Sequence, residues 1–155
     1  MDDQFMRMAI ELAIENVRSG RGGPFGAVVV RGGKLIAGGA NCVTSSSDPT
    51  AHAEVMAIRN ACKAIGNFQL ADCELYTSCE PCPMCMGAIY WARPSNVYYG
   101  CTANDAAQIG FDDSFIYDEL RLLPGQRRIP MMQTLHNEAL AAFREWQQKL
   151  DRVPY

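Results

Sequence analysis

The sequence predicts an α/β fold in a single domain. Segments with the three-and-four spacing of amphipathic helices alternate with short runs of strand-forming residues, and this alternation indicates a sheet covered by helices. At 155 residues the chain is long enough for one domain with a hydrophobic core. We therefore expect one domain over residues 1–155, with parallel pairing where strands alternate with helices.

Each predicted element rests on local signals. Apolar residues from Phe5 to Val17 fall on one helical face, and Ser19-Gly20 would end that helix. Thr50 is the expected N-cap of the second helix. The helix after Cys82 is apolar nearly all round, so we expect it to be buried. The expected elements are helix 2–19, strands 27–30 and 35–40 around a turn at 31–34, loop 42–49, helix 51–65, strand 74–78, helix 82–92, strand 96–99, short helices 105–109 and 113–122, strand 129–134 and helix 137–151.

Composition limits the function classes. The hydrophobic content of 48% with 20% charged residues is typical of a soluble globular protein, and no stretch is long and apolar enough to span a membrane. The formal net charge of −3 disfavours a general nucleic-acid binder, which would carry a basic field. Seven cysteines without a signal peptide indicate a reducing, cytoplasmic location with thiols used for packing or metal.

The stretch Glu80-Pro-Cys-Pro-Met-Cys-Met-Gly-Ala carries the chemistry. Cys82 and Cys85 lie three positions apart at the expected start of a helix, where residues of that spacing share a face. Pro83 fits the first helical turn, and the positive end of the helix favours thiolates. Zinc also accepts histidine nitrogen, and His52 lies thirty positions upstream.

Together, His52-x-Glu54 and Pro81-Cys82-x-x-Cys85 match the signature of zinc deaminases. Three protein ligands would leave the fourth zinc position for water, which is typical of a catalytic site. Zinc with two thiolates and a neutral imidazole has no net charge, so a base is needed to take the water proton, and Glu54 is the candidate. The hydroxide would attack an amino-bearing ring carbon, and Glu54 would then deliver protons that release ammonia.

Longer segments of the sequence indicate one family among the zinc deaminases. The sequence resembles the bacterial guanine deaminases of the short zinc type, within the cytidine-deaminase-like superfamily. The blocks that carry the resemblance are 22–28, Asn41, 48–54, 76–85, 87–94, 110–117 and the terminal Tyr155. The resemblance implies a three-layer α/β/α sandwich around a central mixed five-stranded sheet. It also implies hydrolysis of guanine to xanthine and ammonia in purine catabolism.

The same resemblance assigns roles to individual residues. It implies that His52, Cys82 and Cys85 bind zinc, and that Glu54 and Asp113 are catalytic. It implies that the C-terminal segment, from about residue 123, is exchanged between the subunits of a homodimer, where Tyr155 would close over the pocket. The residues it implies for substrate binding are Phe25, Asn41, Ala53, Trp91, Asp113 and Tyr155.

Other functions stay open at this point. The motif spacing also fits a tRNA adenosine deaminase or a deaminase of cytosine, guanosine or an aminotriazine. A zinc-stabilised interaction module would need a fourth ligand such as Cys79. A thiol redox protein would use Cys82 and Cys85 alone, leaving His52 and Glu54 without a role.

Overall fold

The computed structural model describes residues 2–155, which form two compact units, one up to Asp113 and one over Ser114–Tyr155. The first holds α1 (Asp3–Arg18), β1 (Gly26–Arg31), β2 (Lys34–Ala40), α2 (Val43–Ser46), α3 (Ala53–Ile65), β3 (Cys73–Cys79), α4 (Pro83–Ala92), β4 (Asn96–Cys101) and α5 (Ala103–Gln108).

The sheet of the first unit is mixed, with the strand order β2-β1-β3-β4. β1 is antiparallel to both of its neighbours, with Val28 opposite Gly38 on one side and Tyr76 on the other. β3 and β4, which α4 connects, pair in parallel as expected, but β3 is antiparallel to β1, so the expected parallel pairing does not extend across α3. The hairpin between β1 and β2 turns at Gly32 and Gly33, whose positive φ angles of 54° and 72° suit glycine.

The sheet has four strands, not the predicted five. The expected strand at 129–134 lies in the second unit and has no strand conformation. Pro130 removes a backbone donor there, and Ile129 and Met132 are 81% and 86% exposed. A strand requires a neighbouring strand to pair its backbone groups. The apolar side chains that suggested a strand here are not buried in this unit.

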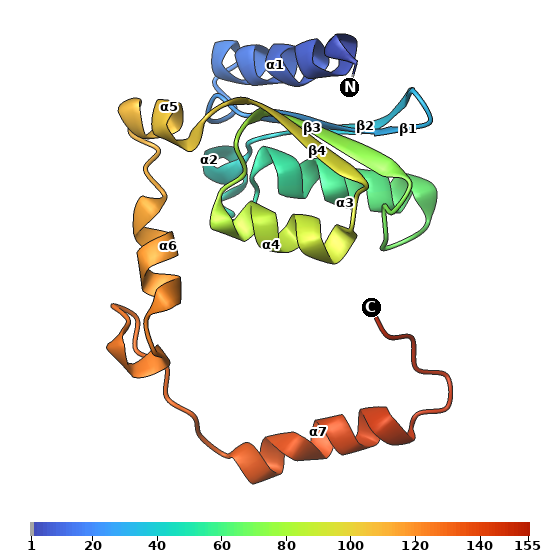
Figure 1. The fold of residues 1–155 in the computed structure, drawn as a ribbon, viewed down its shortest axis with the longest axis vertical. Helices are drawn as coiled ribbons and strands as arrows, with labels where there is room; N and C mark the ends of the chain where they lie inside the picture. The colour runs from blue at the N-terminus through green and yellow to red at the C-terminus, as the bar shows by residue number, and fades with distance from the viewer. Residues whose placement is uncertain (1) are drawn as a thin grey trace. The chain divides into compact units, whose positions relative to one another are not determined.

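Helices cover both faces of this sheet, which confirms the three-layer α/β/α arrangement for the first unit (Figure 1). Val28 and Val30 pack with Phe5 and Ala9 of α1. The intervening Val29 belongs to the core under α3 and α4 on the other face. Alternate side chains of one strand thus enter two different cores, as the period of two requires.

Two helices differ from the sequence-based expectation, α3 in its start and α4 in its burial. α3 begins at Ala53, and its N-cap is His52, because Thr50 instead donates its hydroxyl to Asp48. In α4 only three residues are buried, and Trp91 is 62% exposed, so the prediction of a wholly buried helix was wrong. α4 contributes one face to the core, and its other face carries aromatic side chains.

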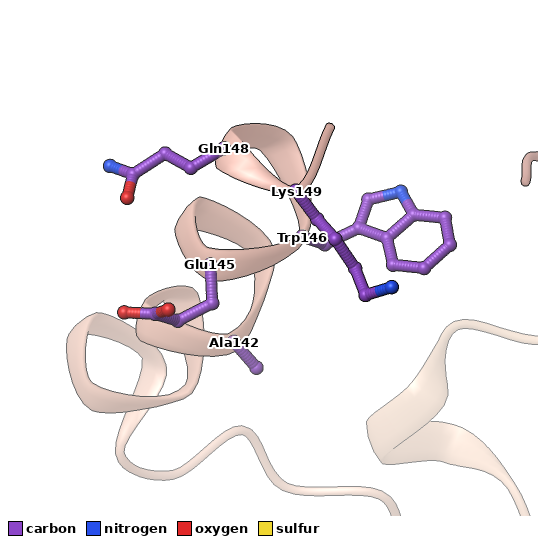
Figure 2. A pocket seen from close by; sticks show the side chains of 5 residues that line it. All are labelled: Ala142, Glu145, Trp146, Gln148 and Lys149. Carbon is purple, nitrogen blue, oxygen red and sulfur yellow. The ribbon is translucent and has the colours of Figure 1, made fainter. Parts of the chain in front are cut away.

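The second unit is helical, with α6 (Ser114–Arg121), a 3-10 turn (Pro124–Gln126) and α7 (His136–Gln148). Apolar side chains of this unit are exposed, Phe143 of α7 by 69% and Leu150, which follows the helix, fully. A hollow on this unit is lined only by side chains of α7 and by Lys149, which follows it (Figure 2). Within residues 2–155 no helix is long and apolar enough to cross a bilayer.

Candidate metal centre

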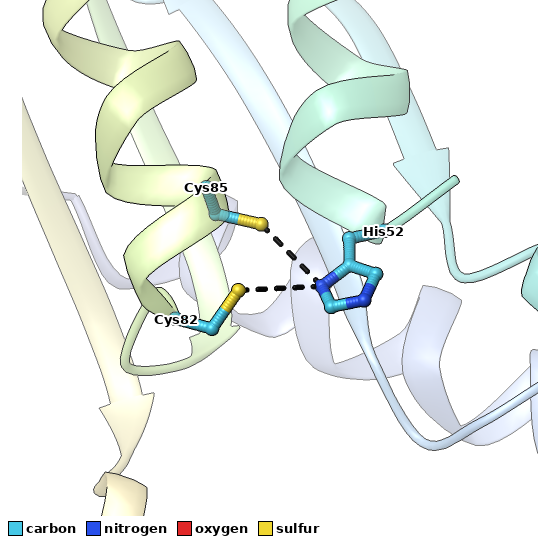
Figure 3. A group of neighbouring side chains, drawn as sticks. All are labelled: His52, Cys82 and Cys85. Carbon is cyan, nitrogen blue, oxygen red and sulfur yellow. Dashed lines mark hydrogen bonds between the residues drawn. The ribbon is translucent and has the colours of Figure 1, made fainter. Parts of the chain in front are cut away.

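Three ligand atoms converge where α3 and α4 begin. His52 Nδ1 lies 3.5 Å from the Sγ atoms of both Cys82 and Cys85 (Figure 3). The three ligand atoms all lie within 4.8 Å of one another. Zinc bonds of about 2.3 Å to sulfur and 2.0–2.1 Å to nitrogen at tetrahedral angles separate the two ligand atoms by about 3.6 Å. The spacing therefore fits a zinc ion without rearrangement.

The helix starts explain how residues of this spacing meet. His52 has the extended backbone of an N-cap (φ −71°, ψ 156°), so it is not bound to a helical face. Glu54 lies within the first turn of α3, and the angular separation expected for residues two apart in a helix does not apply. Cys82 is likewise the N-cap of α4, with Pro83 at its first position and Cys85 in its first turn.

The two thiols have opposite acidities. The hydrogen bond from Cys85 lowers the pKa of Cys82 to about 4, and the interaction with His52 adds to this effect. The pKa of Cys85 is raised, first by this same bond and then by burial. The two shifts have opposite directions, which favours the thiolate on Cys82 and the thiol on Cys85. The bond to Cys82 also raises the pKa of His52.

Glu54 lies beside the ligands and outside the metal group. The residue is 6% exposed, and its Oε2 accepts a hydrogen bond from Cys85 Sγ at 3.4 Å. Burial is the main cause that raises the pKa of Glu54 above the ordinary value of 4.5. A buried carboxyl with a raised pKa is suited to taking up and giving back protons near neutral pH.

The purine-binding residues expected in the first unit lie on separate elements. Phe25 precedes β1, buried Asn41 follows β2, and Ala53 is the first residue of α3. Asn41 Oδ1 accepts N–H bonds from Gly23 and Val43, both at 3.3 Å. Asp113 has a raised pKa, mainly through burial and then through the charge of Cys82, so it lies within electrostatic reach of the ligands.

The roles expected of Trp91 and Tyr155 stay predictions. Trp91 lies near the end of α4 and is 62% exposed, and Tyr155 belongs to the second unit. Two other residues had no predicted role. Phe111 packs edge-on against Phe25 with ring centroids 5.0 Å apart. Asn16 is buried beneath the loops of Phe25 and Asn41. The sequence feature that could have identified it is a polar amide on the otherwise apolar face of α1.

Comparisons with known proteins agree with this geometry. Residues 1–101 match the family model of the cytidine and deoxycytidylate deaminase zinc-binding region. The chain is 55% identical over 153 residues to guanine deaminase of Bacillus subtilis, covering 99% of this chain and 98% of that protein. The X-ray structure of that deaminase superimposes with a TM-score of 0.97 and 54% identity, over 100% of this chain and 99% of that one. The tRNA-specific adenosine deaminase of Haemophilus influenzae is 39% identical over 80% of this chain and 75% of its own.

Proposed function

The chain belongs to the cytidine and deoxycytidylate deaminase zinc-binding family, and within it we propose that it hydrolyses guanine to xanthine and ammonia. The observation that carries this proposal is the near-complete coverage of a guanine deaminase at 55% identity, joined to a fitting ligand group at His52, Cys82 and Cys85. The tRNA deaminases match a smaller share of the chain at lower identity.

His52, Cys82 and Cys85 hold the zinc ion. When bound, zinc supplies a Lewis acid that makes water a nucleophile at neutral pH. The Cys82 thiolate is already favoured before the metal arrives, and Cys85 must release its proton on binding, because only deprotonated thiols are zinc ligands. Among residues 2–155 no fourth cysteine, histidine or carboxylate belongs to this group, which would suit a catalytic zinc ion better than a structural one.

Glu54 moves the protons of the reaction. Its carboxylate takes one proton from water as the oxygen bonds to the amino-bearing carbon of the ring, and gives that proton to the adjacent ring nitrogen. It then takes the second proton of the added oxygen and gives it to the amine, so that the carbon–nitrogen bond breaks and ammonia leaves. Its burial and its raised pKa support both directions of transfer.

The polar groups of the first unit can identify the purine. Asn41 has its Oδ1 occupied by two backbone donors, so its amide Nδ2 is the group to offer to a ring acceptor. Asp113 supplies an acceptor for the adjacent ring N–H and amine of guanine and helps to relay the proton to the leaving amine. Phe25 stacks on the ring, Phe111 buttresses Phe25, and the backbone of Ala53 completes the contact.

The active form is a homodimer that exchanges its C-terminal segment, from about residue 123, between subunits. Support comes from the second unit, where Phe143, Trp146 and Leu150 are exposed although their spacing is that of a buried helical stripe. A second chain would bury this stripe, and Tyr155 would then close over the pocket in trans, with Trp91 of α4 contributing from the same chain as the zinc ligands. The seven free thiols support a cytoplasmic location.

The test is ammonia release by the purified, zinc-loaded protein from guanine, with adenine, cytosine, guanosine and an aminotriazine in parallel. Release from guanine alone is the expected result. Silence on guanine with zinc present would overturn the substrate while leaving the metal site intact. A salt-sensitive shift of tRNA on a gel would instead support the tRNA deaminase alternative, which the sequence pI of about 5.3 disfavours.

A further inference from the structure

Asn16 is a buried amide on a helix whose other buried residues are apolar. The buried positions of α1 are Phe5, Ala9, Ala13 and Asn16, and Asn16 is 1% exposed. Among residues 2–155, its side chain forms hydrogen bonds with Gly23 and Asn41 and not with the metal ligands. Burying an amide is costly unless its polar groups are paired. An amide at this position is therefore expected to bind other polar groups.

Both donors of the amide are used, and both hold loop carbonyls. Nδ2 donates to the carbonyl of Gly23 and to the carbonyl of Asn41, each at 2.8 Å. The amide oxygen Oδ1 has no hydrogen-bond partner among residues 2–155. An apolar residue would fill the position without this unpaired acceptor. What the amide adds is a joint hold on two carbonyls that come from different loops.

These two loops are also bonded to each other. Gly23 N donates to Asn41 Oδ1 at 3.3 Å, and Asn41 N donates to the carbonyl of Phe25 at 3.0 Å. Gly22 has no room for a Cβ, which would meet the Asn41 carbonyl and the Asn16 amide. The amide of Asn16, the Gly23 backbone and both ends of Asn41 therefore form one closed, tightly packed ring.

We propose that Asn16 is a positioning residue for purine binding, acting through Asn41 and Phe25. The inference rests on the proposed function. The orientation of the Asn41 amide follows from the position of Gly23, which Asn16 fixes. The backbone at Phe25 is bonded to Asn41, so the stacking ring is set by the same ring of bonds. The zinc ligands and Glu54 are held by α3 and α4, so substrate affinity depends on Asn16 and the chemical step does not.

The test is Asn16→Leu, which keeps the side-chain volume and removes both donors. In the zinc-loaded variant we expect KM for guanine to rise by about tenfold or more, the equivalent of one misplaced hydrogen bond. We expect kcat within about threefold of the parent, because a loss of uniform binding raises KM alone. Asn16→Ser, which retains one donor, should give a smaller rise, and it serves where the leucine variant does not fold.

Two controls separate positioning from general instability. Phe5→Leu weakens the packing of the same helix against Tyr76 without touching either loop. Asn60→Leu removes another amide-to-carbonyl bond, from α3 to Gly38, elsewhere in the unit. Both should leave KM unchanged at a temperature where the variants stay folded. An unchanged KM in a folded Asn16→Leu protein, a loss confined to kcat, or an equal rise in the Phe5 control would overturn the proposal. If the parent releases no ammonia from guanine, it is the proposed function that fails.

Discussion

Replacing Glu54 by glutamine should stop turnover without releasing zinc. The substitution is isosteric and removes only the ability to take and give a proton. Within residues 2–155 the metal group consists of His52, Cys82 and Cys85, so metal content should stay at the level of the parent. The burial that raises the pKa of Glu54 disfavours its ionised form in the folded state above the ordinary pKa of 4.5. A neutral amide there removes this penalty, so the variant should be no less stable at pH 7.

The size of the effect follows from the number of proton transfers. A positioned acid or base contributes about 10²–10⁴ in rate, and Glu54 serves in successive transfers, so we expect kcat to fall by about 10³–10⁴. This corresponds to roughly 4–5.5 kcal/mol of barrier. The assay is ammonia release at saturating guanine, with zinc measured by elemental analysis of the same preparation.

A matched control is available on the opposite face of the sheet. Glu74 accepts hydrogen bonds from the hydroxyls of Tyr76 and Tyr98 and lies on the α1 side. Glu74→Gln should keep kcat within about threefold, since it removes a carboxylate remote from the ligands. A zinc-loaded Glu54→Gln protein that retained a tenth of the parental kcat, or one that lost its zinc, would refute the assignment of the base.

Three further results are expected. Cys82→Ser should lower zinc affinity by more than about 100-fold in a metal-competition titration, whereas Cys62→Ser should leave it unchanged; equal losses would remove Cys82 from the ligand set. Deleting the residues after Val153 should lower kcat/KM for guanine by at least about tenfold with the melting temperature nearly unchanged, and unaltered kinetics would exclude Tyr155 as a lid. Gly39→Ala should cost about 1–3 kcal/mol in chemical denaturation, because a Cβ there would meet the backbone of α3. The control is Gly87→Ala, at an exposed helical position with open space, which should gain about 0.5–1 kcal/mol. A Gly39→Ala protein as stable as the parent would contradict the close approach of α3 to β2.

The ligand set was predictable from sequence because its signals are local. The spacing of Cys82 and Cys85 with a proline between them indicates a helix start, and His52-x-Glu54 supplies the remaining groups. The sequence predicted His52 inside a helix, whereas it is the N-cap. The choice between Thr50 and His52 depends on the turn that Asp48 makes with Thr50, which propensities do not resolve.

Features that depend on distant contacts were not predictable in the same way. The antiparallel pairing of β1 with β3 joins segments separated by α3, and no periodicity in either strand reports direction. Asn16 occupies a core position that pattern alone assigns to an apolar residue, and its reason is two carbonyls elsewhere in the chain. The apolar residues at 129–134 have the composition of a buried strand, and the sequence alone does not show that they are exposed in a single chain.

The antiparallel pairing of β1 with β3 also bears on how the protein acquires its metal. The β1–β2 hairpin joins neighbours in sequence and can close early, whereas β1 meets β3 only after a long loop has been ordered. His52 lies between β1 and β3 in the sequence and Cys82 follows β3, so we expect the ligands to approach each other late, when β3 has joined the sheet. We therefore predict that zinc does not guide folding. It should act on the finished protein by slowing unfolding, with little change in the folding rate, and stopped-flow measurements with and without zinc distinguish the two.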